Sequence, residues 1–175
     1  MIDRIDIRKN LPTDIAALKG LYLKAFPDED LSPLLRELLN EKDGVLSLIA
    51  VSGSTLVGHV IFTMCSLDGR SQNIALLGPL AVSPKVQQQG IGSALVKAGF
   101  ERVKSEGIEQ VNVLGDPAYY SRFGFKADGD VLPPYKLPAE WETAWQLVSL
   151  NDGSPDLAGK LSVPAPWRQP HLWLP

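Results

Sequence analysis

The residues best suited to chemistry are two adjacent tyrosines, Tyr119 and Tyr120, in the segment LGDPAYYSRFGF. A phenol has an ordinary pKa of about 10, so it is protonated at neutral pH and can donate a proton to a leaving group. Adjacent helical positions point about 100° apart, so only one of the two can face a given reacting atom. Aromatic packing is the other role open to both tyrosines.

A second chemical feature is the turn QQQGIG, Gln87 to Gly92, which runs from an apolar strand pattern into a helical one. N–H groups at a helix N-terminus have no intrahelical partner and attract phosphate. Glycines let the backbone approach a pyrophosphate, and glutamine amides donate hydrogen bonds. The turn lacks the lysine of a Walker loop and the third glycine of a dinucleotide fingerprint. A plain strand-to-helix turn without a ligand is the remaining alternative.

The hydrophobic pattern predicts alternating strands and helices that position these two features. We expect a helix capped by Thr13, a central strand over 73–82 with a bulge at Gly78-Pro79, and a short helix capped by Asp116. The other expected elements are a strand at 5–7, a helix at 32–40, a hairpin of 46–51 and 56–65, a helix at 90–106, and strands at 110–114 and 141–150.

Two motifs carry a resemblance to a known family. The pattern Gln-x-x-Gly-x-Gly after Leu-x-Val-x-Pro, in LAVSPKVQQQGIGSAL at 80–95, resembles the acetyl-CoA motif of the GCN5-related N-acetyltransferases (GNAT). The segment 114–125, which ends in Tyr-x-x-x-Gly-Phe, resembles that family's post-strand motif, and the order of elements is similar over about 3–150. This version is similar to a bacterial subgroup of predicted acetyltransferases, the YhbS-like proteins.

The resemblance implies an α/β protein with the GNAT acyl-CoA N-acyltransferase fold, a mixed and mostly antiparallel sheet flanked by helices. It implies a single N-acetyltransferase domain over 1–175, with a family-like core at about 3–150 and a Pro/Trp-rich extension at 151–175. Acetyl-CoA would be the acyl-donor cosubstrate, attacked directly by an amine in a ternary complex without a metal. The alternative is a catalytically inactive acyl-CoA-binding sensor or interaction module.

The resemblance also assigns roles to individual residues. Tyr120 is marked as the general acid, and Tyr119 and Phe123 lie at the cofactor. The pantetheine amides are expected to pair with the backbone of Leu80, Ala81 and Val82, as an added strand would. The pyrophosphate is expected on Gln87, Gln88, Gln89, Gly90, Ile91, Gly92 and Ser93.

For the general base and for the acceptor site, the sequence offers alternatives. Many relatives place a glutamate on or beside the central strand, but 74–82 carries no acid. His59 has a suitable ordinary pKa, although a partly buried histidine packed within the sheet is the better explanation. A water chain near Gly78-Pro79 is a further alternative. The acidic residues Asp28, Glu29 and Asp30 could attract a cationic amine or form a solvated loop.

Composition limits the other classes of partner. The 175 residues have a net charge of −3 and no basic block, so we expect no nucleic-acid partner and instead a small-molecule or peptide amine. The single cysteine, the absence of a secretory pattern and the absence of a long apolar run predict a cytoplasmic protein without membrane contact. A homodimer is left open.

The tail with Trp167 and Trp173 is expected to cover a sheet edge or to meet a partner.

Overall fold

The computed structural model describes residues 4–151 and 157–174. The chain forms two compact units, of which unit 1 comprises Met1–Phe62 and Gly78–Arg102, and unit 2 comprises Thr63–Leu77 and Val103–Pro175. Two long strands, β3 (Thr55–Leu67) and β4 (Arg70–Val82), and the helix α3 (Ile91–Ser105) contribute to both units.

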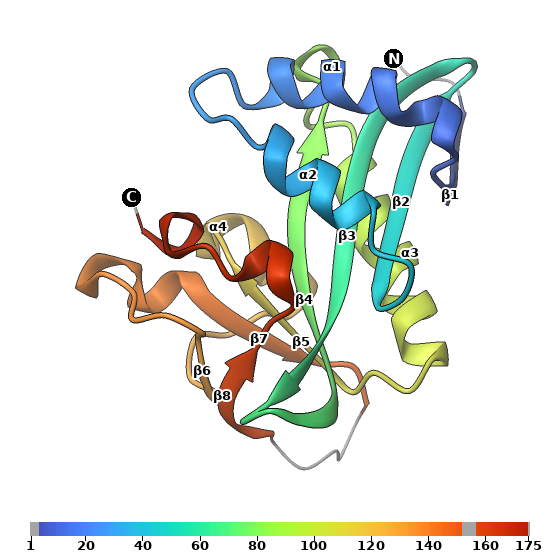
Figure 1. The fold of residues 1–175 in the computed structure, drawn as a ribbon. Helices are drawn as coiled ribbons and strands as arrows, with labels where there is room; N and C mark the ends of the chain where they lie inside the picture. Colours follow the sequence, from blue (N-terminus) through green and yellow to red (C-terminus); the bar gives the residue numbers. More distant parts are fainter. Residues whose placement is uncertain (1–3, 152–156, 175) are drawn as a thin grey trace. The chain divides into compact units, whose positions relative to one another are not determined.

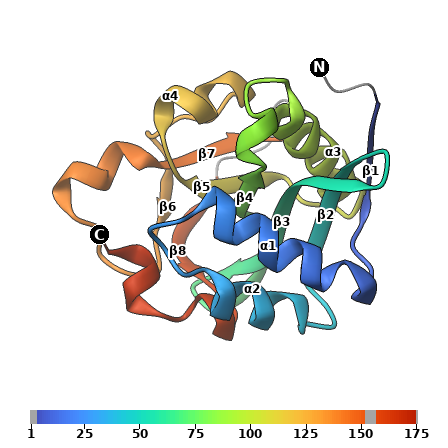
Figure 2. The same cartoon turned by 90° about the horizontal axis from the view of Figure 1, so that it is seen from above.

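Unit 1 contains a sheet with helices on both faces (Figure 1). Strand β1 (Ile5–Lys9) pairs antiparallel with β2 (Val45–Ser52), from Ile5↔Ser52 to Lys9↔Leu48, and β2 neighbours β3. Seen from above in Figure 2, helices α1 (Ile15–Ala25) and α2 (Ser32–Leu39) lie on one side of these strands and α3 on the other. A 3-10 turn, Pro84–Val86, follows β4 in this unit.

The start of α1 differs from the expectation that Thr13 caps it. A 3-10 turn, Pro12–Asp14, leads into α1, and Asp14 is the residue before the helix. The Asp14 carboxylate accepts a hydrogen bond from the Leu11 backbone N–H and pairs with the Arg8 guanidinium at 2.8 Å. The prediction of a Thr13 cap is therefore wrong, because the chain already enters a 3-10 turn at Pro12, and the residue before α1 makes no side-chain cap hydrogen bond.

Unit 2 is built on β5 (Gln110–Leu114), which lies between two partners. It pairs parallel with β4, from Ile74↔Gln110 to Leu77↔Val113, and antiparallel with β7 (Trp145–Ser149). The β4 residues in this register, Ile74, Ala75, Leu76 and Leu77, are all buried, as expected of a central strand. The helix α4 (Pro117–Tyr120) and 3-10 turns at Ser121–Phe123 and Ala139–Ala144 complete the middle of this unit.

The C-terminal segment belongs to the core of unit 2. Strand β8 (Ala158–Ser162) pairs parallel with β6 (Asp130–Leu132) and antiparallel with the end of β3, where Ser66 faces Ser162. Two 3-10 turns follow, Ala165–Trp167 and Pro170–Trp173. Trp167 and Trp173 are buried, so both side chains pack inside unit 2. These two rings are not exposed for a partner.

Most predicted elements are present, and the larger differences in extent concern β3, β4 and β7. Strands β3 and β4 are longer than predicted, and β4 runs through Gly78-Pro79, whose peptide bond is cis. The strand predicted at 141–150 is a 3-10 turn up to Ala144 and a strand only from Trp145. Residues 152–156 and 175 of the predicted extension lie outside the described residues. Within the described part of the chain, no helix is long and apolar enough to cross a bilayer.

Candidate functional site

In unit 1, the glycine-rich turn is held by its own side chains and backbone. After β4 ends at Val82, the Gln87 side-chain amide donates a hydrogen bond back to the Val82 carbonyl at 3.2 Å. Gln88 and Gly90 adopt positive φ angles of 63° and 85°. This conformation suits glycine, and it turns the chain sharply into α3. The exposed turn Gln87–Gly90 therefore has a defined backbone conformation and is hydrogen-bonded to the end of β4.

The start of α3 presents unused donors. The helix begins at Ile91, and the Ala94 N–H donates to the Gly90 carbonyl at 3.0 Å. The N–H groups of Ile91, Gly92 and Ser93 precede this first helical hydrogen bond, so the helix itself does not use them. Together with the positive end of the helix dipole, they form a site suited to an anion.

Glycines on β3 and α3 allow these two elements to pack closely within unit 1. A Cβ added to Gly58 on β3 would lie 2.9 Å from both Ile91 Cγ2 and Leu95 Cδ1. A Cβ added to Gly99 would collide with the Phe62 ring. The first turn of α3 is thus fixed against β3, because only a residue without a side chain fits at Gly58. Sequence reasoning missed this role of Gly58, whose signal was a glycine inside an otherwise apolar strand.

The predicted pantetheine-binding residues, Leu80, Ala81 and Val82, are the last three residues of β4. Ala81 is buried, whereas Leu80 and Val82 are half-buried. Pairing between β4 and β5 ends at Leu77, before this segment begins. Immediately after it, the Ser83 N–H donates to the Val57 carbonyl at 2.8 Å, which ties the end of β4 to β3.

In unit 2, the tyrosine segment forms the predicted short helix. The Asp116 side chain accepts a hydrogen bond from the Ala118 N–H at 3.0 Å, and Pro117 occupies the first helical position, so the predicted Asp116 cap is confirmed. Gly124 ends the following 3-10 turn with a φ of 90°. A Cβ added to Gly115 would collide with the Tyr120 ring, so close packing at this glycine restricts where Tyr120 lies.

The two tyrosines occupy different environments. The Tyr120 ring packs edge-on against Phe125 and Tyr119, and burial raises the pKa of its hydroxyl, with a smaller contribution from Tyr119. Burial also raises the pKa of Tyr119, but the nearby Arg122 opposes that shift, with its guanidinium carbon 4.4 Å from the ring centre. Phe123 contacts both tyrosine rings. Tyr120 is consequently a neutral proton donor over a wide pH range.

His59 lies at the centre of a buried hydrogen-bonded chain in unit 1. Its Nδ1 is 2.7 Å from the Tyr22 hydroxyl on α1, and its Nε2 is 2.7 Å from the Ser47 hydroxyl on β2. The side chain is fully buried, and this burial lowers its pKa to about 3. Both ring nitrogens are used inside the protein, and the imidazole is neutral at pH 7.

The acidic residues Asp28, Glu29 and Asp30 lie on the exposed loop between α1 and α2. Asp30 Oδ1 accepts a hydrogen bond from the Ser32 N–H at 3.0 Å, which shapes the start of α2. In the described residues, no group of three or more His, Cys, Asp or Glu side chains is arranged to hold a metal ion.

The strand pairing and the motif loops define an acyl-CoA N-acyltransferase fold, and comparison with known proteins agrees. Residues 15–125 match the Acetyltransferase (GNAT) family. The chain therefore belongs to the GNAT family, and the predicted fold and enzyme class are confirmed.

Individual relatives also span nearly the whole chain. The uncharacterized N-acetyltransferase YjhQ of Escherichia coli K12 is 30% identical over 161 residues, which cover 88% of this chain and 89% of that protein. The crystal structure of E. coli YhbS in complex with CoA is 27% identical, covers 97% of this chain and 94% of its own, and has a TM-score of 0.84. A GNAT acetyltransferase from Brucella melitensis, solved with acetyl-CoA, is 27% identical, covers 94% and 98%, and has a TM-score of 0.75.

Proposed function

We propose that this protein transfers an acetyl group from acetyl-CoA to an amine, by direct attack of the amine on the thioester. The observation that carries the proposal is the loop from Gln87 to Ser93, whose unused N–H groups open α3. A pyrophosphate needs converging donors, and this loop supplies them without a lysine. The family match and the CoA-bound structures of the two relatives support acetyl-CoA as the anion concerned.

Acetyl-CoA, the acyl donor, would be bound by two segments of unit 1, the end of β4 and the start of α3. The backbone of Leu80, Ala81 and Val82 pairs with the pantetheine amides, in the manner of strand addition. The pyrophosphate is held by the N–H groups at the start of α3, and the glutamine side chains at Gln88 and Gln89 add donors. Gln87 instead holds the loop in shape, since its amide is bonded to Val82.

The chemical step needs one proton to be given and one to be removed. The amine nitrogen attacks the acetyl carbon, the C–S bond breaks, and the CoA sulfur receives the proton of the Tyr120 hydroxyl. The proton that the nitrogen loses as the amide forms passes through water to the Tyr120 oxygen and restores its hydroxyl. Burial keeps this hydroxyl protonated at neutral pH and makes it a weaker acid, so it hydrogen-bonds to the leaving sulfur and transfers its proton only as negative charge develops there. The ammonium form of the acceptor must lose its proton beforehand, and we assign that step to water rather than to His59, whose nitrogens are both occupied.

The acceptor class follows from charge. Asp28 and Glu29 are exposed acids on one loop of unit 1, and they would draw a cationic amine towards the enzyme. A small polyamine, an amino sugar and a peptide amine all have this chemistry, so the acceptor is proposed only as a cationic amine.

The test is thiol release from acetyl-CoA across a panel of amines, together with a CoA titration. We expect CoA to bind and at least one cationic amine to give acetylated product by mass spectrometry. CoA binding without turnover on any amine would favour the second candidate, an inactive acyl-CoA-binding module. One observation favours that candidate, namely that β4 carries no acidic side chain and His59 is sequestered. Absence of CoA binding would contradict both.

A further inference from the structure

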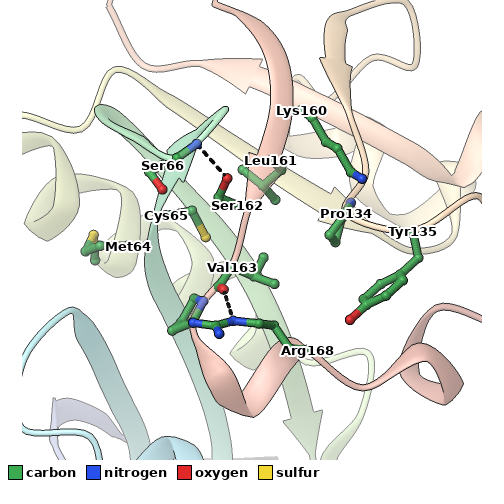
Figure 3. Close-up of a pocket in the computed structure, with 12 residues that line it drawn as sticks. Met64, Cys65, Ser66, Pro134, Tyr135, Lys160, Leu161, Ser162, Val163 and Arg168 are labelled. Carbon is green, nitrogen blue, oxygen red and sulfur yellow. Dashed lines mark hydrogen bonds between the residues drawn. The ribbon is translucent and has the colours of Figure 1, made fainter.

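Unit 2 contains a large cavity that the proposed acetyl transfer does not use. Its volume is about 850 Å³, within the range typical of small-molecule sites. It is formed by the end of β3, the strand β8, the loop after β6 and the segment after β8 (Figure 3). Neither the Gln87–Ser93 loop nor Tyr120 lines it.

The cavity has an apolar wall. Leu161 and Val163 on and just after β8 are buried, and Met64 from β3 is half-buried. Pro134 and Pro164 add further apolar surface. The Cys65 thiol donates to the Thr63 carbonyl at 3.3 Å, and burial raises its pKa to about 12, so it is neutral. This wall suits a hydrocarbon body.

The polar groups of the cavity are donors. Lys160 from β8, Arg168 from the C-terminal segment and the Tyr135 hydroxyl come from three separate segments, as Figure 3 shows. Arg168 uses its Nε to donate to the Val163 carbonyl at 3.0 Å, which orients the guanidinium and leaves its two terminal nitrogens available. The Ser162 hydroxyl accepts from the Gly69 N–H at 2.9 Å, so its own hydrogen is also available to a ligand.

No negative charge compensates these cations within the cavity. None of the twelve lining residues is acidic. Asp68, whose carboxylate accepts a hydrogen bond from the Lys160 backbone N–H, is not among them. In the described part of the chain, neither Lys160 nor Arg168 has an ion-pair partner. Two cations beside an apolar wall select for an anion with an apolar body.

We propose that this cavity binds an amphipathic anion, a medium-length hydrocarbon chain that ends in a carboxylate or phosphate. The hydrocarbon lies against Met64, Pro134 and Pro164, which are half-buried. The anionic group receives hydrogen bonds from Lys160, Arg168 and Tyr135. The planar guanidinium of Arg168 matches the paired oxygens of either head group. This ligand is separate from acetyl-CoA, so the proposal stands whether or not the protein transfers acetyl groups.

The test is calorimetric titration of the full chain at constant ionic strength with octanoate, octyl phosphate, octanol and inorganic phosphate. We expect octanoate or octyl phosphate to bind at least about tenfold more tightly than octanol, which lacks the charge. Inorganic phosphate, which lacks the apolar body, should also bind at least about tenfold more weakly. The tighter of the two anions identifies the head group, and either result supports the proposal. Equal affinity for octanol, or no binding by either anion, would overturn it.

Variants locate the site. Lys160→Gln and Arg168→Gln alter exposed side chains, so the fold should be retained, and each should weaken binding by at least about threefold. Lys104→Gln removes an exposed lysine of the same unit outside the cavity and should leave the affinity unchanged. Saturating CoA should not displace the probe. Competition by CoA, or equal effects of Lys104→Gln and Lys160→Gln, would contradict the assignment.

Discussion

At the scale of single residues, Tyr120 is the group on which the proposed chemistry depends. Tyr120→Phe removes the hydroxyl and keeps the ring that packs on Gly115 and Phe125. We expect kcat for thiol release to fall at least about tenfold, as loss of a general acid does, with CoA affinity nearly unchanged. Tyr119→Phe is the matched control and should retain most of the activity. Unchanged turnover in Tyr120→Phe would remove this residue from the mechanism.

The buried His59 predicts a pH dependence of stability. Its pKa is about 3 in the folded protein and about 6.5 in an unfolded chain, so between these values only the unfolded state binds the proton. The free energy of unfolding should therefore fall as pH decreases below about 6.5, by up to about 1.4 kcal/mol per pH unit. Denaturant unfolding measured between pH 7 and about 5 tests this, before carboxylates titrate strongly.

The control for that experiment uses the other histidine. His59→Gln removes the titrating group and should flatten the decline between pH 7 and 5, although it lowers stability at pH 7 because Tyr22 or Ser47 loses a partner. His171→Gln, at an exposed position, should keep the wild-type slope. An identical slope in His59→Gln would show that another group causes the decline.

At the scale of elements, the position of α3 depends on Gly58. Gly58→Ala places a methyl group 2.9 Å from Ile91 and Leu95, so α3 or β3 must shift. Overpacking of this kind costs about 1–3 kcal/mol, and we expect CoA affinity to weaken because the N–H groups of Ile91, Gly92 and Ser93 move with the helix. Denaturant unfolding and a CoA titration measure both effects.

Gly20→Ala provides the matched control for this substitution. Gly20 lies inside α1 with nothing within 4 Å of an added Cβ. Because alanine is the better helix former, stability should rise by about 0.5–1 kcal/mol, and CoA affinity should not change. If Gly58→Ala behaved like Gly20→Ala, close packing at Gly58 would not position the loop.

The sequence predicted elements where a local signal decides the structure. The Asp116-Pro117 cap and the apolar run of β4 each depend on neighbouring residues, and both are confirmed. The prediction of a Thr13 cap is wrong because it overlooks the 3-10 turn Pro12–Asp14, which Asp14 stabilises through the Leu11 N–H and through Arg8, six residues away. The glycine contacts and the occupied nitrogens of His59 could not be predicted, because they depend on which strands and helices meet in space.

At the scale of the whole molecule, residues far apart in the sequence pack together in the core of unit 2. The Trp167 indole donates to the Thr63 hydroxyl at 3.2 Å, across a sequence separation of 104 residues. The Trp173 indole donates to the Trp167 carbonyl at 3.0 Å, and its ring lies 5.7 Å from that of Trp145. The family match ends at 125, so residues beyond it supply this part of the core. The sequence left open whether this tail covers the fold or meets a partner.

Because Trp173 is part of this core, we predict that the 3-10 turn Pro170–Trp173 is essential for the stability of the fold. Trp173 is 1% exposed, so Trp173→Ala leaves a large cavity and an unpaired Trp167 carbonyl, and we expect a loss of about 3–5 kcal/mol. Trp141→Ala is the control, because Trp141 is partly exposed on the 3-10 turn Ala139–Ala144, and it should cost clearly less. Denaturant unfolding followed by far-ultraviolet circular dichroism measures both variants without relying on tryptophan fluorescence. Equal, small losses would mean that the tail only covers unit 2 and does not help to hold it together.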